Sequence, residues 1–302
     1  MNTTSNYRKT DSETKRKSIS KRIVFSWLLG LFASGFSSWA GVFAVKHWDF
    51  VWQSRAILQA VLMSGIALLG IWLLRKKIDK GNPTTIGLNS LKPTILKFLL
   101  GIGIILVPII ITLLSSFVMD SSMITYNFNL SILKSFAIGI VTVFLFEGLP
   151  EELLFRGYIY SNLNSHYARW KSAIITVLLF VLLPILLAPI QKHILGMDVY
   201  LGGNNYVAPS YVLTLLVFGS FVQYLRMLSN SVWVGIGFHT LFVYFDRIMG
   251  TTSDNLIQFN LTGGSELPLQ IAFIGSLLLV FLIVILYPKI SKRNIGWKEI
   301  QK

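Results

Sequence analysis

Three carboxylates and one guanidinium lie close together in this sequence, between Glu147 and Arg156. Glu147, Glu151 and Glu152 are three of only 13 acidic residues in the chain, and they end an apolar run long enough to cross a membrane. In a helix, Glu152 and Arg156 would be four positions apart with the acid first, which is the favourable order for an ion pair. Because ionisable groups are costly near hydrocarbon, those found there usually mark a functional site.

Glu147 and Glu151 are also four positions apart, so two like charges would share one helical face. In a poorly solvated place such charges interact strongly, and one carboxylate of the pair can serve as a general base. A structural interpretation stays open beside this one. Pro150 suits the first position of a new helix, where acidic residues simply complement the helix dipole, and Arg156 would then be an interfacial anchor.

His239 is the second candidate, because it falls near the middle of the apolar run 230–248. A mid-span imidazole needs a partner, since an unpaired polar group in hydrocarbon is expensive. Gly235 and Gly237 precede it and would let a neighbouring helix approach closely. The alternative is a structural histidine that holds two helices together through a hydrogen bond to a backbone carbonyl. Asp246 lies seven residues on, where a solvated anchor is the expected role.

Composition places these residues in a membrane protein. The chain has 302 residues, of which 53% are hydrophobic and 13% are charged, whereas soluble domains have about 25% charged residues. The absence of cysteine excludes disulfides, thiolate metal sites and thiol catalysis. The net charge of +14 is carried by tails and short connections, a pattern that indicates membrane topology and contact with anionic lipids rather than nucleic acid.

Apolar runs near 20 residues predict an all-α, polytopic helix bundle with about eight transmembrane helices. The expected spans are 23–45, 56–74, 94–118, 131–149, 171–190, 208–227, 230–248 and 267–287. Basic and base-poor connections alternate along the chain, so we expect both termini to be cytoplasmic and the protein to lie in the cell membrane. The segment 150–170 has helical periodicity and is expected at the cytoplasmic interface. The connections 191–207 and 249–266 should be irregular.

The two candidate segments together carry a resemblance. Glu151-Glu152-x-x-x-Arg156, followed by Gly157, resembles the first motif of the CAAX-protease and bacteriocin-processing family (CPBP, or Abi) of intramembrane proteases. The stretch from Tyr224 to His239 is similar to the last conserved block of that family, which ends in a histidine. The resemblance covers roughly residues 130–245.

The resemblance divides the chain into four expected parts. These are a basic cytoplasmic tail, three N-terminal transmembrane helices, a CPBP-like core, and an outer loop with the last transmembrane helix and a basic cytoplasmic tail. Their limits are 1–22, 23–119, 120–250 and 251–302.

The family implies a bundle whose polar pocket opens to the cytoplasm, with the acidic cluster at its mouth. Carried onto this chain, Glu151 would be the main catalytic base, and Glu152 and Arg156 would support the geometry. His239 would polarise the attacking water or stabilise the oxyanion. The implied partner is a peptide or membrane-protein substrate. Some members are described as metalloproteases, so the resemblance also makes a divalent metal such as zinc a candidate cofactor.

The sequence departs from the family at two positions. The middle motif is Phe-x-x-x-His, but Phe180 is followed four residues later by Pro184, and the nearby His193 is too far along a regular helix to substitute. The final motif usually continues His-x-x-x-Asn or Asp, but Val243 stands there. Neither proline nor valine has a side chain that can donate or accept a hydrogen bond. One histidine and three carboxylates do not make a full zinc ligand set of the usual kind.

Three functions stay open on the sequence. The first is an intramembrane endopeptidase that uses Glu151 and His239. The second is a proteolytically silent family member that acts as a bacteriocin-immunity or scaffold protein. The third is a transporter-like proton or cation relay through Glu147, Glu151 and Glu152, which lacks the internal repeat that such folds usually show.

Overall fold

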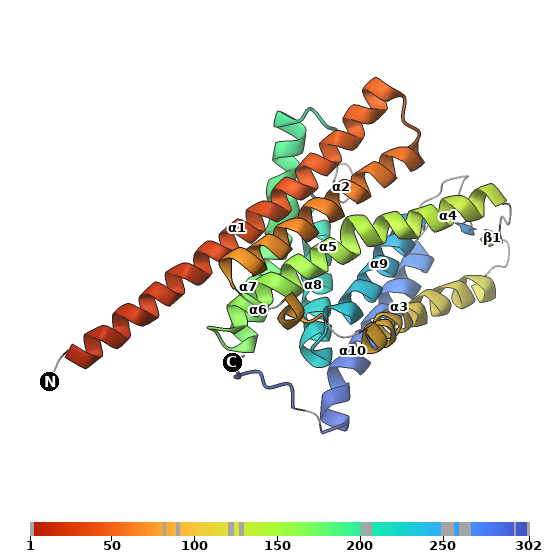
Figure 1. The fold of residues 1–302 in the computed structure, drawn as a ribbon. Helices are drawn as coiled ribbons and strands as arrows, with labels where there is room; N and C mark the ends of the chain where they lie inside the picture. Colours follow the sequence, from red (N-terminus) through yellow and green to blue (C-terminus); the bar gives the residue numbers. More distant parts are fainter. Residues whose placement is uncertain are drawn as a thin grey trace.

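The chain is an almost entirely helical bundle (Figure 1). The computed structural model describes residues 3–80, 83–88, 91–119, 124–126, 130–199, 201, 207–248, 257–259, 267–292 and 294–300. In this part of the chain, seven helices are long and apolar enough to cross a membrane. Large apolar side chains cover much of their outer surfaces, so these faces contact lipid tails. The prediction of a multi-pass, all-α membrane protein is confirmed.

Helices α1 (Thr3–Trp48) and α2 (Trp52–Leu73) form a long antiparallel pair along one side of the bundle (Figure 1). A π-helical turn, Leu74–Ile78, ends α2, and a 3-10 turn, Pro83–Ile86, follows. The indole of Trp27 on α1 donates a 2.9 Å hydrogen bond to the Leu179 carbonyl, which ties this pair to a helix from the middle of the chain.

Helix α3 (Leu91–Met119) packs against α9 (Val232–Ile248) and α10 (Leu267–Ile290). Two short strands, β1 (Ile124–Tyr126) and β2 (Ile257–Phe259), pair antiparallel beyond these helices. The sequence did not predict them. The rest of the expected irregular connection 249–266 lies outside the described residues.

The segment with the acidic cluster is one continuous helical run, Leu130–Asn164. It consists of α4 (Leu130–Val143), α5 (Leu149–Glu152) and α6 (Tyr160–Asn164), joined by π-helical turns. These turns are Phe144–Gly148 and Leu153–Ile159.

This run corrects two expectations. Pro150 does not begin a separate interfacial helix over 150–170, because the π-helical turn before it already departs from the regular hydrogen-bond pattern that a proline would interrupt. The carboxylates therefore lie within a long helix instead of at its end.

The remaining helices place the second candidate segment. α7 (Arg169–Pro189) continues into a π-helical turn, and α8 (Pro209–Ser229) turns sharply into α9. Asn230 has a left-handed backbone at that turn, with φ of 51°, as expected for asparagine. α9 occupies the predicted span 230–248. It has 17 residues, of which eleven are buried, and lies inside a ring of other helices.

Candidate active site

The centre of the candidate site is the carboxylate of Glu152, which joins two helices. Its Oε1 accepts a hydrogen bond from Arg156 Nη1 at 3.1 Å, so the ion pair predicted from the spacing is present. The same oxygen lies 3.0 Å from Nδ1 of His239 on α9. Glu152 and Arg156 have no exposed surface, and His239 is 3% exposed. A cation and an imidazole thus share one oxygen in the interior of the bundle.

Besides Glu152, the guanidinium of Arg156 contacts a backbone carbonyl and an aromatic ring. Nη2 donates to the Gly219 carbonyl of α8 at 3.2 Å, and the guanidinium carbon lies 4.2 Å from the centre of the Phe180 ring on α7. Such a cation over an aromatic face is attracted by the ring quadrupole. Arg226 Nε in turn donates to the Arg156 carbonyl at 3.1 Å. Arg156 is therefore a fixed structural charge for Glu152, and a surface-anchor role is wrong.

His239 reaches Glu152 because α9 approaches that helix closely. A Cβ atom added at Gly235 would lie 2.9 Å from Glu152 Oε2, so any larger residue there would have to displace that carboxylate. Gly237 lies against the Phe98 carbonyl of α3. The predicted role of both glycines, close approach of neighbouring helices, is confirmed. The hydrogen-bond partner of His239 is a carboxylate and not a backbone carbonyl, so the alternative of a structural histidine bonded to a backbone carbonyl is wrong.

Glu151 and Glu147 are placed differently from Glu152. Glu151 is half-buried and lies within electrostatic range of His239, Glu147, Glu152 and Arg156. Among the described residues, its carboxylate makes no hydrogen bond and no ion pair. Glu147 forms an ion pair with Arg247 near the end of α9. The structure thus separates one free carboxylate from two that have partners.

The residues at the two departures from the family motif, Pro184 and Val243, offer no polar side chain to this site. Pro184 is half-buried on α7, one turn beyond Phe180, and Val243 is half-buried and packs against the apolar core. Within the described ranges, no group of three or more His, Asp and Glu side chains is placed to hold a metal ion. The residues present do not fit a zinc site of the usual kind.

A second charged cluster was missed by the sequence reasoning. The side chain of Asp79, 1% exposed, accepts hydrogen bonds from Arg75 at 2.7 Å and from the Tyr158 hydroxyl at 3.0 Å, and lies 3.3 Å from Arg22. Asn162 Nδ2 donates at 3.5 Å to Asp79 Oδ2, the oxygen that also accepts from Arg75. The cluster ties α1 and the end of α2 to the helical run that carries Glu152. Its only sequence signal was one acid within a basic connection.

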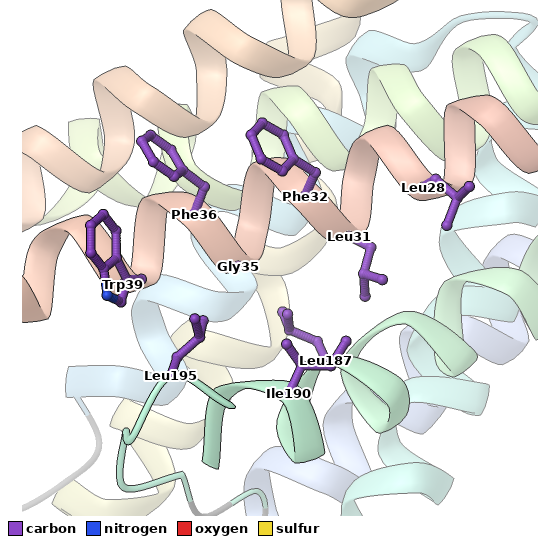
Figure 2. Close-up of a pocket in the computed structure, with 9 residues that line it drawn as sticks. All are labelled: Leu28, Leu31, Phe32, Gly35, Phe36, Trp39, Leu187, Ile190 and Leu195. Atoms are coloured by element: carbon purple, nitrogen blue, oxygen red, sulfur yellow. The ribbon is translucent and has the colours of Figure 1, made fainter. Parts of the chain in front are cut away.

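A separate pocket of about 480 Å³ lies between α1 and α7 (Figure 2). All nine residues that line it are apolar or glycine: Leu28, Leu31, Phe32, Gly35, Phe36, Trp39, Leu187, Ile190 and Leu195. With no ionisable side chain in its lining, this pocket offers shape and apolar surface but no catalytic group.

The buried Glu152–Arg156 pair and its histidine lie in a segment that resembles known proteases. Residues 133–245 match a family model, Type II CAAX prenyl endopeptidase Rce1-like. The match confirms the family resemblance over these residues. This Rce1-like segment runs from α4 to α9 and contains Glu151, Glu152, Arg156 and His239. Comparison with curated proteins and with solved structures gave no match.

Proposed function

We propose that this protein is an intramembrane endopeptidase that cleaves a membrane-associated protein or peptide. One observation carries the proposal: Glu152 binds both Arg156 and His239 inside the bundle, while the carboxylate of the adjacent Glu151 has no hydrogen bond or ion pair within the described part of the chain. The Rce1-like match supports the class of reaction. Ordinary helix-start acids need no buried histidine from another helix.

The arrangement suits activation of water. Glu151 accepts a proton from a water molecule, whose oxygen attacks the carbonyl carbon of the scissile peptide bond. His239 is held through Nδ1 by Glu152, so its Nε2 contacts the water or the oxyanion that develops. Glu151 then returns the proton to the leaving amine nitrogen as the C–N bond breaks. Arg156 holds the Glu152 carboxylate in place.

The same proposal covers the substrate class, the membrane topology and the division of the chain. The substrate is a peptide or membrane protein, and the CAAX prenyl peptides named by the family model are one candidate class. The basic tails and connections face the cytoplasm and contact anionic lipids of the cell membrane. The four-part division at residues 22, 119 and 250 separates the N-terminal helices from a catalytic core.

A silent family member is the second candidate, and Pro184 and Val243 favour it. Both positions lack the polar side chain that the family motif has. Such a protein would bind a partner at the same buried cluster, as a bacteriocin-immunity or scaffold protein does, without hydrolysis.

The test uses the full chain in lipid nanodiscs with two probes, a farnesylated CAAX peptide and an unmodified mixed peptide library, read by mass spectrometry. We expect cleavage by the wild type and a loss of at least about a hundredfold in kcat for Glu151→Gln and for His239→Ala. Glu299→Gln, which changes an exposed glutamate, is the matched control. Equal cleavage by wild type and Glu151→Gln, or no cleavage of either probe, would favour the silent protein.

A further inference from the structure

Gln223 on α8 is a buried amide without a partner. Its side chain belongs to a residue that is 1% exposed. Neither Nε2 nor Oε1 has a hydrogen-bond partner within the part of the chain that the structure describes. Burial of a primary amide with no compensating hydrogen bond is costly. A group that carries this cost in the free protein is suited to receive a ligand.

The position of Gln223 connects it to the candidate active site. Gly219 and Arg226 lie four residues before it and three residues after it, and hence on the same face of α8. Both bind Arg156: the Gly219 carbonyl accepts from Nη2, and Arg226 Nε donates to the Arg156 carbonyl. The Gln223 amide therefore belongs to the face of α8 that lies against Arg156.

Two more polar atoms on the facing helical run are also without partners. Glu152 Oε2 and Arg156 Nε are buried and make no hydrogen bond with any described residue. Oε2 and Val222 Cγ1 both lie close to the α-carbon of Gly235, at 2.9 Å and 3.0 Å from the position of an added Cβ. Val222 directly precedes Gln223 in the chain. Unsatisfied polar atoms thus occur on both of the helical segments that Arg156 joins, α8 and the run that carries Glu152.

We propose that Gln223 binds the backbone of an extended peptide substrate. The N–H and C=O of one residue point to the same side of an extended chain, so a single amide can donate to the carbonyl through Nε2 and accept the N–H at Oε1. This pair of bonds recognises the main chain and not a particular side chain. The assignment rests on the proposed endopeptidase function, since it supplies the substrate contact for that site.

The test compares Gln223→Met with Thr112→Val in full-length protein in nanodiscs. Methionine keeps the length of glutamine and removes both hydrogen-bonding atoms, whereas Thr112 is a buried residue whose hydroxyl already bonds the Pro108 carbonyl. We expect Gln223→Met to raise KM about tenfold for the cleaved probe, with kcat nearly unchanged and with equal or higher thermal stability. Gln223→Asn, which withdraws the amide by one methylene, is the second variant and should raise KM similarly.

A probe series in which single backbone amides are replaced by esters gives the decisive readout. An ester lacks the N–H, so at one position near the scissile bond the ester probe should have a higher KM than the amide probe for the wild type. For Gln223→Met, the ester and amide probes should have the same KM at that position. A lower melting temperature with unchanged KM in both Gln223 variants, or no ester position whose effect depends on Gln223, overturns the proposal and leaves buried water as the partner of the amide.

Binding separates this inference from the proposed function. Photo-crosslinking of the same two probes to Glu151→Gln measures peptide capture without hydrolysis. Capture that falls about tenfold when Gln223→Met is added supports the role of Gln223 even if the wild type cleaves neither probe. Capture that is unaffected by Gln223→Met, or no capture at all, contradicts it, whatever cleavage shows.

Discussion

Glu152 and His239 lie 87 positions apart in the sequence and 3.0 Å apart in the structure. The Glu152 carboxylate also binds Arg156, so removal of Glu152 leaves both His239 and Arg156 without their shared acceptor.

Glu152→Gln should lower the free energy of unfolding by about 3 kcal/mol, because it leaves the buried Arg156 cation uncompensated. Chemical denaturation in mixed micelles measures this change. The double variant Glu152→Gln/Arg156→Met should lose less than the sum of the two single variants, since the uncompensated cation is then gone. Strict additivity would contradict the energetic coupling.

Gly235→Ala should reduce cleavage by at least about tenfold while the protein still folds, because the new methyl group displaces the Glu152 carboxylate and Val222. Gly65→Ala on α2 is the control. Nothing lies within 4 Å of the added methyl there, so that variant should keep full activity and gain a little helix stability. Equal activity in both variants would show that Glu152 tolerates displacement.

Asp79→Asn should lower the free energy of unfolding by about 2 kcal/mol, because Arg22 and Arg75 lose their common carboxylate. Both arginines keep some contact with water, which is why the loss is smaller than for Glu152. Asp49→Asn, at an exposed position with φ of 51°, should be neutral. A thermal unfolding series with the two variants makes the comparison, and a neutral Asp79→Asn would argue against this cluster as a structural tie.

Topology can be read directly, because the chain contains no cysteine. Single substitutions Lys77→Cys and Lys298→Cys should react with a membrane-impermeant maleimide from the cytoplasmic side only, and Lys46→Cys and Lys192→Cys from the outside only. All four positions are exposed. Labelling of Lys77→Cys and Lys298→Cys from opposite sides would mean that α9 does not cross the membrane.

Parts of the fold and site follow from local sequence rules. Apolar runs located the spans, and the four-residue spacing of Glu152 and Arg156 was enough to predict their ion pair. The partnership of His239 with Glu152 instead of Glu151 was not predictable, because it depends on how two helices are rotated relative to each other. Two π-helical turns flank Glu151 and Glu152, and no simple sequence pattern predicts such turns. The helix start predicted at Pro150 is wrong for the same reason. A proline alone indicates a helix start, but the preceding π-helical turn accommodates this one within a continuous helical run.

The π-helical turn Phe144–Gly148 holds one residue more than the α-helical turn it replaces. Loss of one residue here would therefore restore regular winding and leave the helix that follows nearly in its present orientation. Loss of one residue from the regular helix α4 would instead rotate Glu151 and Glu152 by about 100° relative to the start of that helix. Over evolutionary time, insertions and deletions of one residue should be accepted at this turn and excluded from the regular helix beside it.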